Sequence, residues 1–253
     1  MIHPTAIIDS KAELASDVSV GPFSIIGAGV KIDSGTQVGP HVVINGDTQI
    51  GKNNRFFQFS SIGEENQDKK YAGEPTQTII GDNNVFRESC TVHRGTSQDL
   101  GYTQIGSDCL FMAYTHVAHD CVVGNHVIFA NSATAAGHVK IGDWVILGGF
   151  TGIHQFCKIG AHVFAGINSR ITQDIPPYVM LHDSQPRAIN SEGLKRRGYT
   201  SDQIREIKNA FRALYRKGLR LEQAIAEINA ISDKGHIRSI VDFIQASERG
   251  IVR

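Results

Sequence analysis

The run His116-Val117-Ala118-His119-Asp120 places two histidines beside a carboxylate. A histidine can take a proton from an attacking hydroxyl group, which is general-base catalysis. A neighbouring carboxylate can orient the imidazole and stabilise the imidazolium ion that forms. His119 and Asp120 are therefore the candidate base and its partner for an acyl-transfer reaction.

A six-residue period indicates how the chain positions these groups. From residue 2 to residue 62, every sixth residue is apolar: Ile2, Ile8, Leu14, Val20, Ile26, Ile32, Val38, Ile44, Ile50, Phe56 and Ile62. A helix has a period of about 3.6 and a flat strand a period of 2, so neither explains this pattern. Three short strands per triangular coil explain it, with the apolar column on the axis. Residues eighteen apart then lie one coil apart, roughly 4.8 Å in space.

Two interruptions in the column predict loops. Ile62 and Ile80 are eighteen residues apart, which we interpret as one full coil, and the polar residues 63–78 between them are predicted to form an outward loop. After Val92 the column shifts by one residue and runs from Ile105 to Ile171, which places a second loop near residues 94–103. Long loops on a rigid repeat scaffold often carry function.

A different pattern follows Pro176-Pro177. Thr200 and Gln203 have the spacing of a helix capping box, and apolar residues then recur at helical spacing in three segments. The predicted fold class is therefore mainly β, with a parallel β-helix of about ten hexapeptide coils over residues 1–176. Residues 177–253 are predicted to form a linker and a small C-terminal α-helical domain, which would cover the edge of the last coil.

The coil spacing gathers polar residues into one patch. Gly137 lies one coil above His119, and a glycine leaves its backbone N–H open to an oxyanion. The same spacing adds His138, His154 and Gln155. Since no Ser or Cys nucleophile stands beside a histidine, we expect an acceptor hydroxyl to attack a thioester directly. On this geometry alone, a structural polar corner is an equally good explanation.

Composition restricts the partners. The formal net charge is zero, which favours neither nucleic acid nor a membrane surface, and no apolar run has membrane length. Residues 187–220 hold ten basic and three acidic residues, which suits either a solvated helix face or docking of an acidic or phosphate-bearing partner. The four cysteines form no CxxC pair, so we expect a reduced cytoplasmic protein.

Several motifs together resemble the UDP-N-acetylglucosamine acyltransferases that start lipid A synthesis in Gram-negative bacteria. The resemblance covers essentially the whole chain. Its motifs are residues 66–76 (NQDKKYAGEPT), 87–89 (RES), 93–96 (HRGT), 116–121 (HVAHDC), 136–138 (AGH), 154–157 (HQFC) and 192–198 (EGLKRRG). It implies a left-handed β-helix, a homotrimer, and transfer of a 3-hydroxyacyl group from acyl carrier protein to the sugar 3-hydroxyl.

The resemblance also implies residue roles. His119 would be the general base, Asp120 its partner and the Gly137 N–H the oxyanion donor. The sugar, diphosphate and acyl chain would be held by Asp68, Lys70, His116, His138, His154 and Gln155. A neighbouring subunit would bring Asn190, Glu192, Arg196 and Arg197 to the nucleotide. No metal or separate cofactor is implied, because the acyl group is carried on the phosphopantetheine of acyl carrier protein. That acidic partner favours the docking explanation of the basic region.

Three alternatives use the same sequence. His116, His119 and His138 would bind zinc if the chain resembled the gamma-type carbonic anhydrases, but those are shorter and lack the two loops. A structural or ice-binding solenoid predicts a regular outward face, which this chain lacks. The later N-acyltransferase of the pathway resembles a longer chain with an extra N-terminal domain, whereas here the repeat starts at residue 2.

One departure from the family concerns acyl length. The resemblance implies that a position within Ala165-Gly166-Ile167 acts as a ruler for acyl length, since some members of the family place Gly there and take long chains. Ile167 lies 48 residues past His119, under three coils or roughly 13 Å along the axis. A branched side chain at this place would shorten an apolar groove, so we expect a donor of about ten carbons.

Overall fold

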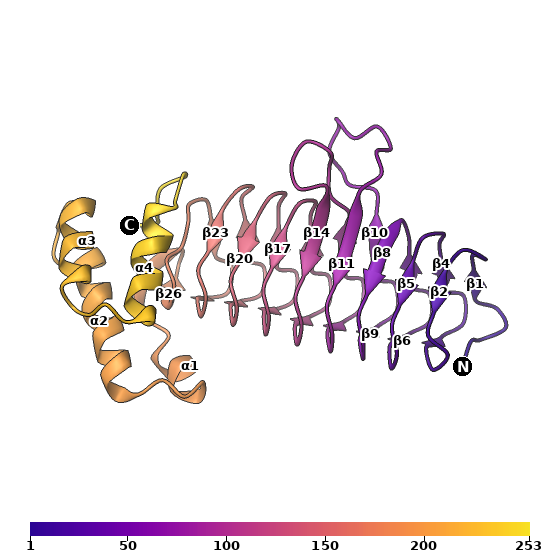
Figure 1. The fold of residues 1–253 in the computed structure, drawn as a ribbon, viewed down its shortest axis with the longest axis horizontal. Coiled ribbons are helices and arrows are strands. Elements are labelled where there is room, and N and C mark those ends of the chain that lie inside the picture. Colours follow the sequence, from indigo (N-terminus) through magenta and orange to yellow (C-terminus); the bar gives the residue numbers. More distant parts are fainter.

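The computed structural model describes residues 1–253, and it shows a three-sided parallel β-helix that ends in a group of helices (Figure 1). The first sheet contains β1 (Ile7–Ile8), β4 (Ile25–Ile26), β7 (Val43–Ile44), β10 (Ser61–Glu64), β13 (Thr91–His93), β16 (His116–Val117), β19 (Thr134–Ala135), β22 (Gly152–Ile153) and β25 (Arg170–Ile171). The second contains β2 (Glu13–Leu14), β5 (Lys31–Ile32), β8 (Asp47–Ile50), β11 (Gln77–Ile80), β14 (Tyr102–Ile105), β17 (Val122–Val123), β20 (Lys140–Ile141) and β23 (Lys158–Ile159). The third contains β3 (Ser19–Val20), β6 (Gln37–Val38), β9 (Arg55–Phe56), β12 (Val85–Phe86), β15 (Leu110–Phe111), β18 (Ile128–Phe129), β21 (Ile146–Leu147), β24 (Phe164–Ala165), β26 (Val179–His182) and β27 (Gln185–Ile189).

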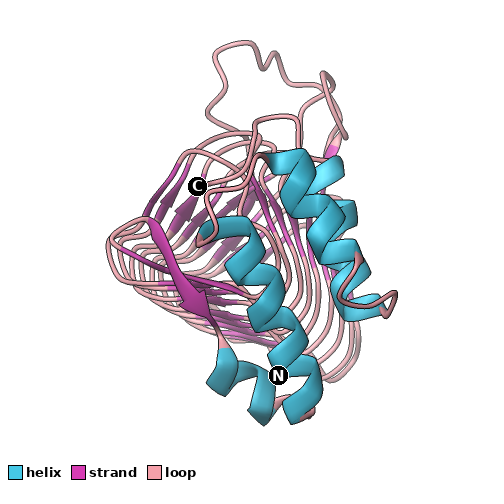
Figure 2. Ribbon diagram, turned by 90° about the vertical axis from the view of Figure 1, so that its left-hand side faces the viewer, coloured by secondary structure: helices cyan, strands magenta, loops and turns pink.

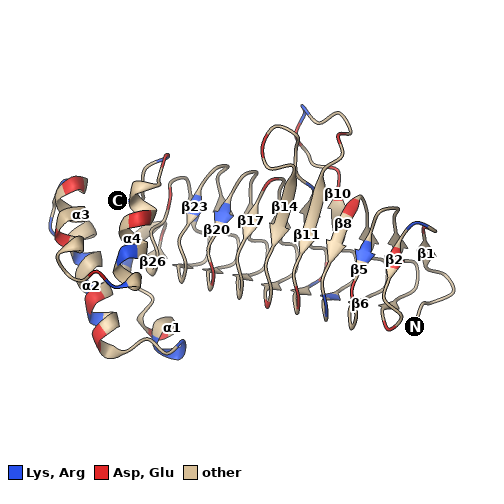
Figure 3. Cartoon of the chain, in the orientation of Figure 1, with Lys and Arg blue, Asp and Glu red and all other residues tan.

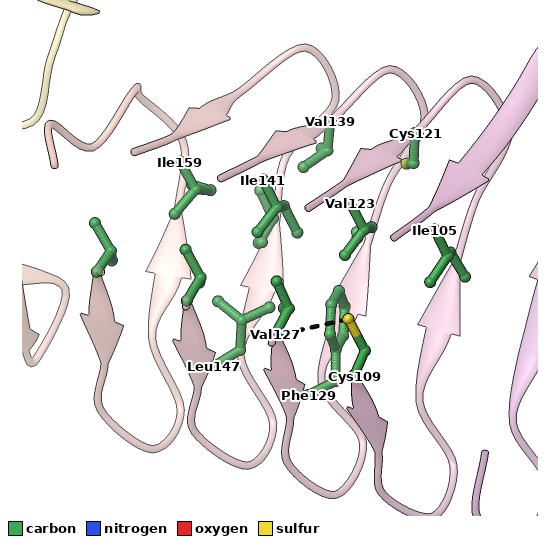
Figure 4. Close-up of a cluster of buried hydrophobic side chains, with 14 of the residues drawn as sticks. Ile105, Cys109, Cys121, Val123, Val127, Phe129, Val139, Ile141, Leu147 and Ile159 are labelled. Atoms are coloured by element: carbon green, nitrogen blue, oxygen red, sulfur yellow. Dashed lines mark hydrogen bonds between the residues drawn. The ribbon is translucent and has the colours of Figure 1, made fainter. Parts of the chain in front are cut away.

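The apolar column forms the core, as the six-residue period predicts. In most strands the second residue points inward and is buried, while the first faces outward. Figure 4 shows Ile105, Val123, Ile141 and Ile159 on successive strands of the second sheet, each in register with the next. Burying one such side chain stabilises the fold by roughly 1.5–3 kcal/mol. This stack holds the coils in one register and therefore fixes the outward residues at the corners.

The interpretation of the Ile62–Ile80 gap as a full coil is wrong. Ile80 pairs with Ile50 in the second sheet, thirty residues away, whereas most partners are eighteen apart. The first loop therefore adds twelve residues to one coil, and Ile62 and Ile80 occupy successive sides of that coil. The second loop adds seven, because Val92 pairs with Val117. A loop of twelve residues keeps the hexapeptide phase, so periodicity alone hides it.

Both loops leave the same corner, between the first and second sheets, which we call the loop corner. Loop 65–76 joins β10 to β11, and loop 94–101 joins β13 to β14. The two project side by side from the β-helix (Figure 1). Asn66 Nδ2 donates to the Gly95 carbonyl at 3.1 Å, and Arg94 Nε donates to the Gly63 carbonyl at 2.9 Å. These contacts tie each loop to the other and to the coil beneath.

Helices cover the C-terminal end of the coil, as Figure 2 shows along the axis. They are α1 (Ser191–Arg196), α2 (Ser201–Tyr215), α3 (Leu221–Asn229) and α4 (Gly235–Gln245). The predicted capping box at Thr200 and Gln203 is confirmed at the start of α2. Before the helices, where the sequence predicts a linker, β26 and β27 form an antiparallel hairpin that extends the third sheet. None of the four helices combines the length and the apolar character that a membrane crossing requires.

Candidate active site

A cavity of about 1530 Å³ follows the loop corner from the two loops toward the C-terminal tail. Its lining includes eight of the residues that the sequence selects: Asp68, Lys70, His116, His119, Gly137, His138, His154 and Gln155. The predicted patch therefore exists, and the first loop contributes to it. Basic side chains of β20, β23 and β25 line the end nearer the helices, and the lysine-bearing strands β20 and β23 are visible in Figure 3.

His119 and Asp120 form the hydrogen-bonded pair that the sequence predicts. His119 Nδ1 lies 2.9 Å from Asp120 Oδ2, and the carboxylate is fully buried. Thr96 of loop 94–101 also binds this carboxylate, through its backbone N–H at 3.1 Å and its hydroxyl at 2.7 Å. Burial alone would raise the pKa of Asp120, but the bonds from His119 and Thr96 outweigh it and lower that pKa. The ionised carboxylate accepts the Nδ1 proton, which leaves Nε2 of His119 as a base.

Gly137 lies directly above the His119 ring. A β-carbon there would stand 2.6 Å from Cε1 and 2.7 Å from Nε2 of His119, so any other residue would displace the ring. The Gly137 backbone N–H donates no hydrogen bond within the chain, although the residue is buried and lines the cavity. A free donor beside the base is the arrangement that an oxyanion site requires.

Two further histidines lie below the pair. The His93 and His116 rings meet edge to face at 4.9 Å, and His116 Nδ1 lies 2.7 Å from Thr91 Oγ1. Burial lowers the pKa of His93, and burial together with the neighbouring histidines lowers that of His116 to about 4. Both rings are thus neutral near pH 7 and can exchange hydrogen bonds with a polar substrate.

Several residues of this site were not predicted from the sequence. Thr96 and Asp99 lie in the second predicted loop, but their contacts depend on how that loop folds back over the corner. Arg249 reaches the site from the far end of the chain, with Nη2 3.4 Å from His154 Nδ1. Phe156 stacks on His138 with ring centroids 4.3 Å apart. The loop position was the only signal for Thr96 and Asp99, and for Phe156 the coil spacing was a usable signal.

The four residues that the resemblance assigns to the nucleotide, here called the nucleotide group, lie elsewhere in the same chain. Asn190, Glu192, Arg196 and Arg197 line a separate cavity of about 270 Å³, together with Ile146, Phe164 and Met180 of the third sheet. Arg197 lies over the Trp144 ring at 4.9 Å and contacts His162 Nδ1 at 3.1 Å. Within one chain, the structure therefore keeps these residues apart from His119.

Ile167 is also outside the main cavity. It lies at the corner between the third and first sheets, and 72% of its surface is exposed. Arg170, three residues further on, does line the main cavity. From the main cavity, an acyl chain would have to cross the outer face of the first sheet to reach Ile167, or it would arrive there from a second subunit.

The zinc alternative is not supported by the arrangement of the histidines. The group that could share one ion is His119, Asp120 and His138, whose ligand atoms lie within 4.8 Å of one another. His116, required by the alternative, is not part of it. The Asp120 carboxylate already accepts bonds from Thr96 and His119. Its oxygens serve the histidine pair and the loop, which leaves a poor ligand for a metal.

The buried histidines predict acid sensitivity. Burial lowers the pKa of His116 and of His162 from 6.5 to about 4 in the folded chain. Between these values the unfolded chain binds more protons than the folded one, so the free energy of unfolding falls as the pH drops from about 6.5 toward 4. Urea unfolding at one protein concentration should give a lower midpoint at pH 5 than at pH 7.5. His162→Gln should reduce the difference between the two midpoints. Equal midpoints at both pH values in the wild type would contradict the predicted acid sensitivity.

Comparison with known proteins gives a consistent picture. Residues 174–252 match the family model described as "Udp N-acetylglucosamine O-acyltransferase; Domain 2", and residues 102–137 match "Bacterial transferase hexapeptide (six repeats)". The chain is 52% identical to the acyl-[acyl-carrier-protein]–UDP-N-acetylglucosamine O-acyltransferase of Janthinobacterium sp. (strain Marseille), covering 100% of this chain and 99% of the relative. The Herminiimonas arsenicoxydans protein of the same name is 53% identical, with the same coverage.

Solved structures agree over the full length. The UDP-N-acetylglucosamine acyltransferase of Francisella novicida has a TM-score of 0.98 at 40% identity, covering 100% of this chain and 94% of that one. The Arabidopsis enzyme of that name has a TM-score of 0.87 at 30% identity, with both chains fully covered.

Proposed function

Since this chain belongs to the acyl-[acyl-carrier-protein]–UDP-N-acetylglucosamine O-acyltransferases, we propose that it moves a 3-hydroxyacyl group to the 3-hydroxyl of UDP-N-acetylglucosamine, the first step of lipid A synthesis. The donor would be the thioester on the phosphopantetheine of acyl carrier protein. The His119–Asp120 pair beside the free Gly137 N–H is the observation that supports this reaction best.

The proposed mechanism uses each part of that site. Nε2 of His119 takes the proton of the sugar 3-hydroxyl as its oxygen attacks the thioester carbonyl. The carbonyl oxygen becomes an oxyanion, which the Gly137 N–H stabilises. Collapse of the intermediate forms the ester and breaks the carbon–sulfur bond, and the leaving thiolate takes the proton from His119. Asp120, held by Thr96, keeps the imidazole oriented throughout.

Direct attack is favoured over an acyl-enzyme because no activated thiol is present. All four cysteines are buried. Burial raises the pKa of Cys109 and Cys157 to about 11 and that of Cys121, next to Asp120, to about 12. A thiol with such a pKa holds almost no thiolate at neutral pH and is a poor nucleophile.

We propose that the complete site requires a homotrimer. The outward residues of the third sheet form an apolar, half-buried row of Val85, Leu110, Ile128, Ile146, Phe164 and Met180. A row of this kind is typical of an interface between subunits. Ile146, Phe164 and Met180 also line the cavity of the nucleotide group. Packing this face against a neighbour's loop corner would bring Asn190, Glu192, Arg196 and Arg197 to that neighbour's His119.

Complementation tests this arrangement. Trimers that contain both His119→Ala and Arg196→Ala subunits, isolated through two different affinity tags, should recover activity at about one site in three. At that site, His119 comes from one subunit and Arg196 from the other.

Arg196→Ala alone should lower kcat/KM for UDP-N-acetylglucosamine by about 10-fold to 10²-fold, since bonds between a guanidinium and a phosphate are lost. The measurement is acyl transfer at low acceptor concentration.

Trimers of each single variant are the controls. If the mixed trimers are no more active than the average of the two controls, both residues act within one subunit, and the shared site is wrong.

A further inference from the structure

The main cavity holds a second aspartate–histidine pair that the reaction described above does not use. Asp99 of loop 94–101 places Oδ2 2.6 Å from Nδ1 of His138, one coil above the Asp120 turn. We propose that Asp99 is a positioning residue that acts through His138 to orient the sugar acceptor. This inference rests on the proposed function and adds a residue to the acceptor site.

The His138 ring is restrained on several sides. Its backbone occupies the left-handed region, with φ 65°, and its N–H donates to the His119 carbonyl at 2.9 Å. Phe156 stacks on one face at 4.3 Å and 8°, and the ring meets His119 edge to face at 4.9 Å. Only 14% of the side chain is exposed. The stacking sets the plane of the ring, but it does not determine which nitrogen carries the proton.

Asp99 determines which ring nitrogen of His138 carries the proton. A carboxylate accepts hydrogen bonds, so the 2.6 Å contact requires the proton on Nδ1 of His138. The nearest other carboxylate oxygen, Oδ2 of Asp120, is 4.0 Å from the same nitrogen. Nε2 of His138 is therefore the ring atom left for a ligand. Without Asp99, either nitrogen could carry the proton, and the hydrogen bond offered to the substrate would change.

Loop 94–101 contacts both aspartate–histidine pairs, His119–Asp120 and His138–Asp99. Thr96 binds Asp120, and Asp99, three residues later, binds His138. The loop closes on itself through the Gly101 N–H, which donates to the Thr96 carbonyl at 3.0 Å. It is anchored separately by Ser97, whose hydroxyl donates to Glu74 Oε1 at 3.3 Å. The same loop geometry thus positions the base and, independently, the neighbouring histidine.

The two rings are close enough to contact one sugar. Their centroids are 4.9 Å apart, and both residues line the cavity. With the base on the attacking hydroxyl, His138 Nε2 would meet another polar group of the same sugar. An oriented bond of this kind contributes to acceptor binding in the ground state and the transition state alike. Its loss should raise KM for the acceptor and leave kcat almost unchanged.

The test compares Asp99→Asn, His138→Gln, the double variant and the wild type in steady-state acyl transfer. Asp99→Asn should raise KM for UDP-N-acetylglucosamine about tenfold, with kcat and the KM for the acyl donor within about threefold of wild type. The double variant should resemble His138→Gln alone, because Asp99 acts only through that ring. Ser97→Ala is the matched control, since it removes one exposed hydrogen bond of the same loop, leaves the contacts of Thr96 and Asp99 in place, and should behave like wild type.

Any of three results would overturn the proposal. One is an unchanged acceptor KM in Asp99→Asn. The second is an additive loss in the double variant, and the third is an equal loss in Ser97→Ala; either would make Asp99 a loop anchor only. Failure of the proposed function has a different signature, since the wild type itself would then transfer no acyl group to UDP-N-acetylglucosamine.

Discussion

Replacing His119 by alanine should lower kcat about 10²-fold to 10⁴-fold, because the attacking hydroxyl then loses its general base. KM should change far less, since His119 acts mainly in the transition state. The fold should persist, because His119 is not part of the apolar core that holds the coils together. Steady-state transfer of a labelled acyl group, together with the thermal unfolding midpoint, measures both effects.

The matched control is His126→Ala. His126 is likewise a corner histidine near a carboxylate, with Nδ1 3.9 Å from Oδ2 of Asp108, but it lies on a different corner of the coil. It should keep wild-type turnover. A His119→Ala enzyme that turns over like wild type would remove this residue from the mechanism, and an equal loss in both variants would point to a general effect on the coil.

Replacing Ile167 by glycine should move donor preference toward longer acyl chains. Each methylene that an apolar pocket accepts or rejects changes kcat/KM by about 10-fold to 200-fold, so the ratio for fourteen-carbon over ten-carbon donors should rise by about 10²-fold or more. The exposed position of Ile167 requires that the acyl chain reach the corner between the third and first sheets. In a trimer, this would place the ruler at a subunit boundary.

Competition between labelled ten-carbon and fourteen-carbon donors measures that ratio in one reaction. Ile167→Val is the control, because it keeps a branched side chain and should keep the preference for about ten carbons. An unchanged ratio in Ile167→Gly would discard this residue as the ruler while leaving the catalytic assignment intact.

The repeat made much of this structure predictable. A strict six-residue column fixes which residues lie above one another, so Gly137 over His119 followed from the numbers alone. The polar composition of residues 63–78 predicted the first loop, but its twelve added residues preserve the phase of the column, so the pairing of Ile80 with Ile50 became apparent only in the structure. The contacts of Thr96 and Asp99 depend on loop folding, which no period encodes.

The C-terminal residues illustrate a different limit. The motif that contains Glu192 and Arg196 marked a functional segment, but its distance from His119 in one chain became apparent only in the structure. Residues contributed by different subunits have no fixed separation in a sequence. The helical spacing predicted α2, α3 and α4, whereas the hairpin β26–β27 is short and has no alternating pattern to reveal it.

The most direct measurement is the transfer of radiolabelled 3-hydroxyacyl groups of ten, twelve and fourteen carbons from acyl carrier protein to UDP-N-acetylglucosamine, by the wild type and by His119→Ala, without added metal. We expect an ester at the sugar 3-hydroxyl, formed most rapidly from the ten-carbon donor, and a loss of turnover by about 10²-fold or more in the variant. No transfer from any donor by the folded wild-type protein would contradict this expectation.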